Sequence, residues 1–141
     1  SDPLNYDNNY RSIRYSDVLL MAAEAAAQSG GANAISYLNQ VRNRAFGNNS
    51  HDYPYNGESD LLGAIADERR IEFAGEGHRF FDLVRTGKAK EAFDNYNATR
   101  PDQTAETEVT FDENKNEIFP IPLVELELAN ALSTWGQNPG Y

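Results

Sequence analysis

Residues 67–87, with the sequence DERRIEFAGEGHRFFDLVRTG, bring many carboxylates and guanidinium groups into one short stretch. Carboxylates beside a histidine, here His78, could carry out acid–base chemistry or hold a metal ion. If the stretch is helical, residues three and four apart become neighbours, so a ladder of alternating charge would form from Glu76, Arg79, Asp82 and Arg85. The charged residues that we treat as candidates are Glu68, Arg69, Arg70, Glu72, Glu76, Arg79, Asp82 and Arg85.

The mixture of charges in this stretch favours a structural network over catalysis. A cation beside a carboxylate stabilises its ionised form and lowers its pKa, whereas a general acid needs a raised pKa. The only histidine besides His78 is His51, which excludes a site built from several histidines. We therefore interpret the charged residues as arginine–carboxylate pairs at the edge of an aromatic core, and we expect Arg79 and Asp82 to lie in a largely buried network.

Three further arginines are expected to tie helices together rather than to bind an anion. Guanidinium groups pair with carboxylates through two parallel hydrogen bonds, a geometry that suits contacts between helices. These arginines and the carboxylates that could pair with them are Arg14, Arg42, Arg44, Glu24, Glu68 and Glu72.

The composition narrows the classes of partner and cofactor. The chain has 141 residues, one domain's worth, and a formal charge of −10 that repels phosphate backbones, so we expect no nucleic-acid partner. Cysteine is absent, which excludes disulfides and thiolate metal sites. The segment Asp112-x-Asn114-x-Asn116 resembles the start of a calcium loop, but Glu117 stands where that loop needs glycine. We therefore expect no cofactor and no metal.

Apolar periodicity predicts a mostly α-helical single domain over residues 1–141. Small residues around Gly30-Gly31 are typical of a tetratricopeptide-like helical hairpin, a unit that needs neighbours to bury its outer face. The predicted helices cover residues 15–29, 33–45, 61–74, 78–86, 88–95 and 123–131, and a small β-hairpin could pair 108–111 with 117–119. The predicted parts are an extended lead-in (1–12), the helical hairpin (13–46), a loop (47–58), charged helices (59–95), and a loop, β-hairpin, final helix and tail (96–141).

The loop over residues 47–58, GNNSHDYPYNGE, is the best candidate for ligand contact. Its rings could stack on the apolar faces of sugars while its amides bond the hydroxyls. The alternative, which we favour, is that the loop is a turn-rich connection with tyrosine packed beside Pro54. Outside the loop, Trp135 could also be an exposed platform, but we favour a role in pinning the C-terminal tail. The candidate ligand-binding residues are His51, Tyr53, Tyr55, Asn56 and Trp135.

Four blocks, in this order, resemble the C-terminal part of the SusD/RagB family of nutrient-binding lipoproteins from Bacteroidetes-type outer membranes. Each block is weak evidence alone, but four in order over nearly the whole chain are specific. The chain departs from the family in two ways: full members are several times longer, and the segment 131–136 interrupts the usual approach to the ending. The blocks are IRYSDVLLM with AEA (13–25), YLNQVRNRA (37–45), ERR followed by EG and RFFDLVR (68–85), and FPIP with QNPGY (119–122 and 137–141).

The resemblance implies a helical scaffold, anchored to the cell surface of the outer membrane through a lipidated N-terminal cysteine. Such proteins cover a SusC-like TonB-dependent transporter and capture glycans or other nutrients without catalysis. Because family members are several times longer, we expect this chain to be a C-terminal fragment without the anchor, acting mainly in scaffolding and transporter docking. Two alternatives remain. A tetratricopeptide-like adaptor predicts more repeats, and a carboxylate-based hydrolase predicts a carboxylate with a raised pKa.

Overall fold

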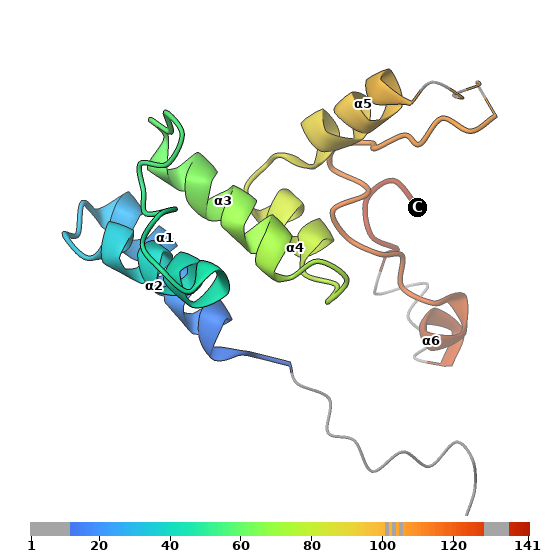
Figure 1. The fold of residues 1–141 in the computed structure, drawn as a ribbon. Helices are drawn as coiled ribbons and strands as arrows, with labels where there is room; N and C mark the ends of the chain where they lie inside the picture. The colour runs from blue at the N-terminus through green and yellow to red at the C-terminus, as the bar shows by residue number, and fades with distance from the viewer. Residues whose placement is uncertain (1–11, 101, 103, 105, 129–135) are drawn as a thin grey trace, which may run out of the picture. The chain divides into compact units, whose positions relative to one another are not determined.

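A computed structural model describes residues 12–100, 102, 104, 106–128 and 136–141. In this part of the chain every regular element is a helix, which confirms the mostly α prediction. The helices are α1 (Tyr15–Ser29), α2 (Ala34–Phe46), α3 (Leu61–Glu72), α4 (Arg79–Arg85), α5 (Ala89–Thr99) and α6 (Leu123–Leu128) (Figure 1). None of them is long and apolar enough to cross a membrane.

Glycines end the first two helices where the sequence predicts. Gly30 follows α1 with a φ of 72°, a conformation that costs glycine little. The N–H of Gly31 donates to the carbonyl of Ala26 at 2.7 Å, which closes the last turn of α1. Gly47 follows α2 with the same φ, and its N–H donates to the carbonyl of Asn43 at 2.9 Å.

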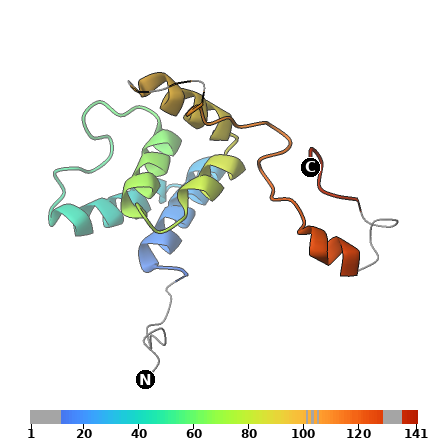
Figure 2. The same ribbon diagram turned by 90° about the vertical axis from the view of Figure 1, so that its right-hand side faces the viewer.

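The chain divides into two compact units, Ser1–His78 and Arg79–Tyr141. In the first unit α1 packs against α2 as a helical hairpin, and α3 packs against both of them (Figures 1 and 2). The single-domain assignment stays a prediction. The buried core of this unit consists of Leu19, Leu20, Ala23, Leu38, Val41, Ala64, Ile65 and Phe73.

The second unit has a small core and a tail held by side-chain amides. Leu83 of α4, Ala89 of α5 and Phe111 are buried together. The Gln137 amide bonds both backbone groups of Ile121, accepting from its N–H at 2.7 Å and donating to its carbonyl at 2.8 Å. The Gln137 amide therefore bonds the Ile121 backbone as a neighbouring β-strand would. These bonds hold the QNPGY motif against the FPIP motif.

The small β-hairpin that could have paired residues 108–111 with 117–119 does not form. Residues 113–117 form a turn, but neither flanking segment is a strand. The Asn97 side chain accepts from the N–H of Val109 at 3.2 Å and donates to its carbonyl at 2.7 Å. On the other side, the Tyr141 hydroxyl donates to the carbonyl of Ile118. Side chains therefore occupy backbone groups that a hairpin would have paired with each other.

Candidate functional site

Arg42 joins α2, the loop over residues 47–58 and α3 through one guanidinium group. Its side chain is only 7% exposed, and its Nε donates to Glu68 of α3 at 3.0 Å. Nη1 and Nη2 donate to the two carboxylate oxygens of Glu58, each at 2.8 Å. Nη1 also donates to the carbonyl oxygen of His51 at 3.3 Å. Arg42 therefore fixes both halves of the loop to the helices.

Further bonds set the path of this loop. The N–H of Tyr53 donates to Oδ1 of Asn39 on α2 at 2.8 Å, and the N–H of Tyr55 donates to Glu58 at 3.0 Å. The Tyr53 side chain is partly buried and packs against the core of the first unit. Tyr53 therefore lies inward rather than as an exposed platform, the packing role that the loop's composition favours.

Three rings form a stack at the end of α2, which we call the ring stack: Phe46, His51 and Tyr55. The rings of Phe46 and His51 are nearly parallel, at 7°, with centroids 3.5 Å apart. The Tyr55 ring follows, its centroid 4.3 Å from that of His51 and its plane tilted by 38°. Oγ of Ser50 lies 2.8 Å from Nδ1 of His51, a contact that orients the imidazole.

Only some of the predicted ligand residues meet in the ring stack. His51 and Tyr55 belong to it, and Asn56 lies next to it in an exposed turn with a φ of 53°. Trp135 lies outside the described residues. Phe46 was not among the predicted ligand residues, because it lies between the predicted helix (33–45) and the predicted loop (47–58). An aromatic residue between a helix and an aromatic-rich loop was the signal that could have found it.

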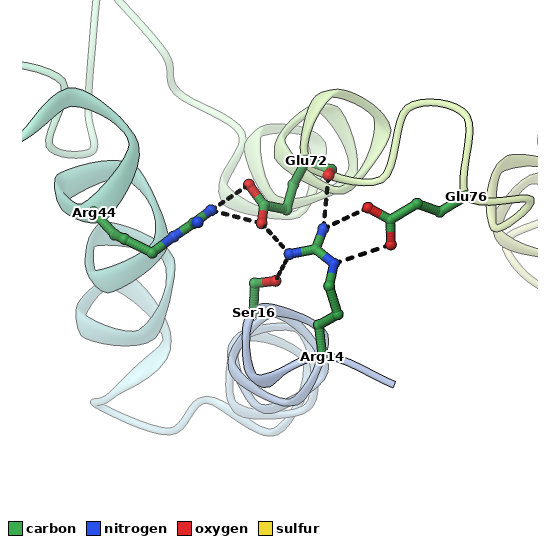
Figure 3. Close-up of polar contacts among 5 residues, drawn as sticks. All are labelled: Arg14, Ser16, Arg44, Glu72 and Glu76. Carbon is green, nitrogen blue, oxygen red and sulfur yellow. Dashed lines mark hydrogen bonds and ion pairs between the residues drawn. The ribbon is translucent and has the colours of Figure 1, made fainter. Parts of the chain in front are cut away.

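A second cluster surrounds Arg14 at the start of α1 (Figure 3). Its Nη1 donates to Oε1 of Glu72 at 2.8 Å and to Oγ of Ser16, while Nη2 and Nε donate to the two oxygens of Glu76. Arg44 of α2 reaches the same Glu72 carboxylate, at 2.6 and 2.7 Å. The cluster therefore joins α1, α2, α3 and the glycine turn that follows α3.

A third contact is a buried ion pair between α1 and α3. Nη1 of Arg69 lies 2.7 Å from Oδ1 of Asp17, and the two side chains are 6% and 8% exposed. The guanidinium groups of Arg69 and Arg14 lie 5.1 and 4.9 Å from the centroid of the buried Phe73 ring. Phe73 therefore makes cation–π contacts with both arginines.

Of the predicted ladder, only the pair of Asp82 and Arg85 forms among the described residues. Glu76 lies before α4 in the glycine turn and bonds Arg14 instead. Arg79 differs from the expectation as well: it is exposed, and Asp82 pairs with Arg85 at 2.9 Å. Arg70 is also exposed. Of the carboxylates expected to pair with Arg14, Arg42 and Arg44, Glu68 and Glu72 do so. The pairing carboxylates of Asp17 and Glu58 were not among those predicted.

The electrostatics of these clusters run against acid–base catalysis. The hydrogen bond from Arg42 lowers the pKa of Glu58 despite partial burial. For Glu72, burial acts to raise the pKa, but hydrogen bonds from Arg14 and Ser16 and the charge of Arg44 outweigh it, so the pKa is lowered. Both carboxylates are therefore held ionised, the state that suits ion pairing and not proton donation.

We expect the free energy of unfolding to fall as the pH drops below about 4.3, the ordinary pKa of a glutamate. Because folding lowers the pKa of Glu58 and Glu72, their contribution is complete above that pH and is lost as the pH falls through the folded-state pKa values. Urea titrations at several pH values, followed by circular dichroism, measure this slope. Glu72→Gln should flatten it, whereas Asp67→Asn, at an exposed position of the same helix, should not. Equal slopes in the wild-type protein, Glu72→Gln and Asp67→Asn would show that Glu72 does not cause the pH dependence.

Replacing Arg79 with alanine should change the free energy of unfolding by less than about 0.5 kcal/mol, because this side chain is exposed and none of the described residues pairs with it. Leu83→Ala in the same helix removes a buried side chain and should cost about 2 kcal/mol or more. Denaturant titration of both variants gives the comparison. If Arg79→Ala destabilises the protein as much as Leu83→Ala does, Arg79 belongs to a buried network after all, and this prediction is wrong.

The chain is similar to known proteins over its whole length. The sequence model of the SusD family matches residues 1–141. The chain belongs to the SusD family. Among curated relatives of this SusD-family chain, SusD-like protein P2 of Formosa agariphila is 35% identical over 140 residues, covering 94% of this chain and 26% of the relative. SusD-like protein P25 of the same organism is 42% identical over 90 residues, covering 62% of this chain and 17% of the relative.

A solved structure supports the same membership. The crystal structure of a SusD homologue from Bacteroides thetaiotaomicron matches this SusD-family chain with a TM-score of 0.74 and 29% sequence identity. The match covers 94% of this chain and 27% of the homologue. The chain therefore spans about a quarter of the length of P2 and of the solved homologue.

Proposed function

We propose that this chain is the C-terminal part of a nutrient-binding lipoprotein at the outer-membrane cell surface. The longer protein would hold glycans or other nutrients for a SusC-like TonB-dependent transporter, without catalysis. Membership of the SusD family over the whole chain carries this proposal. The lipid anchor would belong to a preceding part of the longer protein.

Within that protein, the role we propose for this chain is mainly scaffolding and transporter docking. Tyr15, Val18 and Met21 of α1 are 73%, 46% and 45% exposed. Their spacing of three residues places them on one side of the helix, while Leu20 and Ala23 are fully buried in the core. Helical hairpins of this kind stack so that neighbours cover such faces. We infer that helices of the longer protein cover this exposed face of α1.

The charges of the chain favour binding over catalysis. Acid catalysis needs a carboxylate with a raised pKa, but the carboxylates of Glu58 and Glu72 are paired with arginines and have lowered pKa values. The ring of His78 packs against Phe73, with the centroids 4.8 Å apart. The hydrolase alternative therefore has no observation in its favour, and the adaptor alternative would require more hairpins than α1 and α2 supply.

The proposal is tested by purifying a tagged form of the longer protein from solubilised outer membranes of its native host. We expect it to fractionate with the outer membrane and to bring down a TonB-dependent transporter in near-equal amount. An unrelated outer-membrane lipoprotein with the same tag serves as the control. Recovery of the protein in the soluble fraction, or without any transporter, would contradict the proposal.

A further inference from the structure

We propose that the ring stack of Phe46, His51 and Tyr55 is a binding site for an uncharged pyranose sugar. This inference rests on the proposed function, which makes the longer protein a binder of nutrients, and it places one ligand contact within this chain. The site differs from the one suggested by loop composition, because Tyr53 packs inward and Phe46 takes its place.

The two outer rings of the ring stack expose aromatic surface. Phe46 and Tyr55 are 50% and 41% exposed, although each has His51 against one side of its ring. The exposed part of each outer ring can therefore contact another partner. A pyranose offers axial C–H groups on one face, and aromatic rings are the protein groups that match such a surface in area and shape.

The loop that carries His51 and Tyr55 is held in place before any ligand binds. The buried Arg42 side chain bonds the His51 carbonyl and both oxygens of Glu58, and Glu58 in turn accepts from the N–H of Tyr55. Two of the three rings therefore lie on backbone that a buried guanidinium group fixes. A loop held in its binding conformation loses less conformational entropy when a ligand binds, so a small contact area yields a larger net affinity.

Polar groups beside the ring stack can form hydrogen bonds with a ligand. Nδ1 of His51 contacts Ser50, while no described residue bonds its Nε2. Asn49 and Asn56 are exposed in the same loop, and within the described part of the chain neither side-chain amide has a hydrogen-bond partner. An amide offers two donors and an acceptor, which suits the neighbouring hydroxyls of a sugar. Rings with a few polar groups around them are the usual composition of such sites.

The charge around the ring stack favours uncharged sugars over anionic ones. The loop over residues 47–58 contains no lysine or arginine, and the whole chain carries a formal charge of −10. The guanidinium group nearest the loop, that of Arg42, already has two carboxylate partners, Glu58 and Glu68. The negative charge of the chain would therefore repel uronic acids and sulfated sugars, because the loop has no cation to pair with them. Uncharged sugars would not be repelled.

Ligand-observed NMR on the 141-residue chain tests the site. The probes are maltohexaose, cellohexaose, xylohexaose and mannohexaose, with hexagalacturonate as the anionic comparison. We expect at least one uncharged hexasaccharide to bind and hexagalacturonate not to bind. Phe46→Ala and Tyr55→Ala should each raise the Kd about tenfold or more, the effect of about 1.4 kcal/mol of lost contact.

Two controls separate the site from general unfolding. Phe46→Tyr keeps a ring in the stack and should retain binding, and Phe81→Ala removes an exposed ring of α4 and should leave the Kd unchanged. Circular dichroism checks that each variant is folded. Binding that survives both alanine substitutions would overturn the inference and leave the proposed function standing. Absence of any binding, or preference for hexagalacturonate, would also overturn it, and the transporter purification would then decide the proposed function separately.

Discussion

Replacing Arg42 with methionine is expected to lower the free energy of unfolding by about 3–5 kcal/mol, because the substitution leaves a buried carboxylate without its partner. The Glu68 side chain is 11% exposed and accepts from Nε of Arg42. The same change frees the loop at the His51 carbonyl and at Glu58. Urea titration of the 141-residue chain, followed by circular dichroism, measures the effect.

The matched control for this prediction is Arg44→Met, on the same helix. Arg44 is 61% exposed, and its partner Glu72 keeps a bond from Arg14, so the cost should stay below about 1 kcal/mol. Adding Glu68→Leu to Arg42→Met should recover part of the loss, because the unpaired charge is removed. Similar small costs for the two arginine variants would contradict the assignment of Arg42 as the central contact between loop and helices.

Replacing Arg69 with methionine should also cost about 3 kcal/mol or more, for a related reason. The Asp17 side chain, 8% exposed, would remain buried on α1 without the guanidinium group 2.7 Å away. The contact between that guanidinium and the Phe73 ring would be lost as well. Besides urea titration, amide hydrogen exchange should show faster exchange along α1 and α3, the two helices that this pair joins.

The neighbouring arginine provides the control for the second prediction. Arg70→Met changes the same residue type in the same helix, but at an exposed position, and should shift the free energy of unfolding by less than about 0.5 kcal/mol. Equal effects at the two positions would mean that the cost reflects helix propensity or net charge and not the buried pair.

The helical part of the fold could be predicted because its signals are local. Apolar spacing and the glycines at 30 and 47 placed α1 and α2 within a residue of their observed bounds. Pro122 marked the start of α6 in the same way. These signals depend on neighbours within a few residues, so a single sequence carries them in full.

The parts that could not be predicted depend on contacts between distant residues. Asn97 bonds the backbone of Val109, and no local pattern distinguishes that arrangement from a strand. Asp17 and Arg69 are 52 positions apart in sequence, so spacing could not pair them. The ring stack also depends on distant contacts, because it joins the end of α2 to a loop. Its three rings meet along a loop path that bonds from Arg42 help to set.

The central claim, that this chain is mainly scaffold within a longer nutrient-binding protein, is tested most directly by comparing glycan binding by the two. One hexasaccharide would be titrated by calorimetry into the 141-residue chain and into the longer protein, and the samples would be assayed afterwards for new reducing ends. We predict that the longer protein binds at least about tenfold more tightly, a difference of about 1.4 kcal/mol, with the sugar left intact. Equal affinity would place the whole ligand site in this chain, and cleavage of the sugar would make the protein an enzyme; either result contradicts the account.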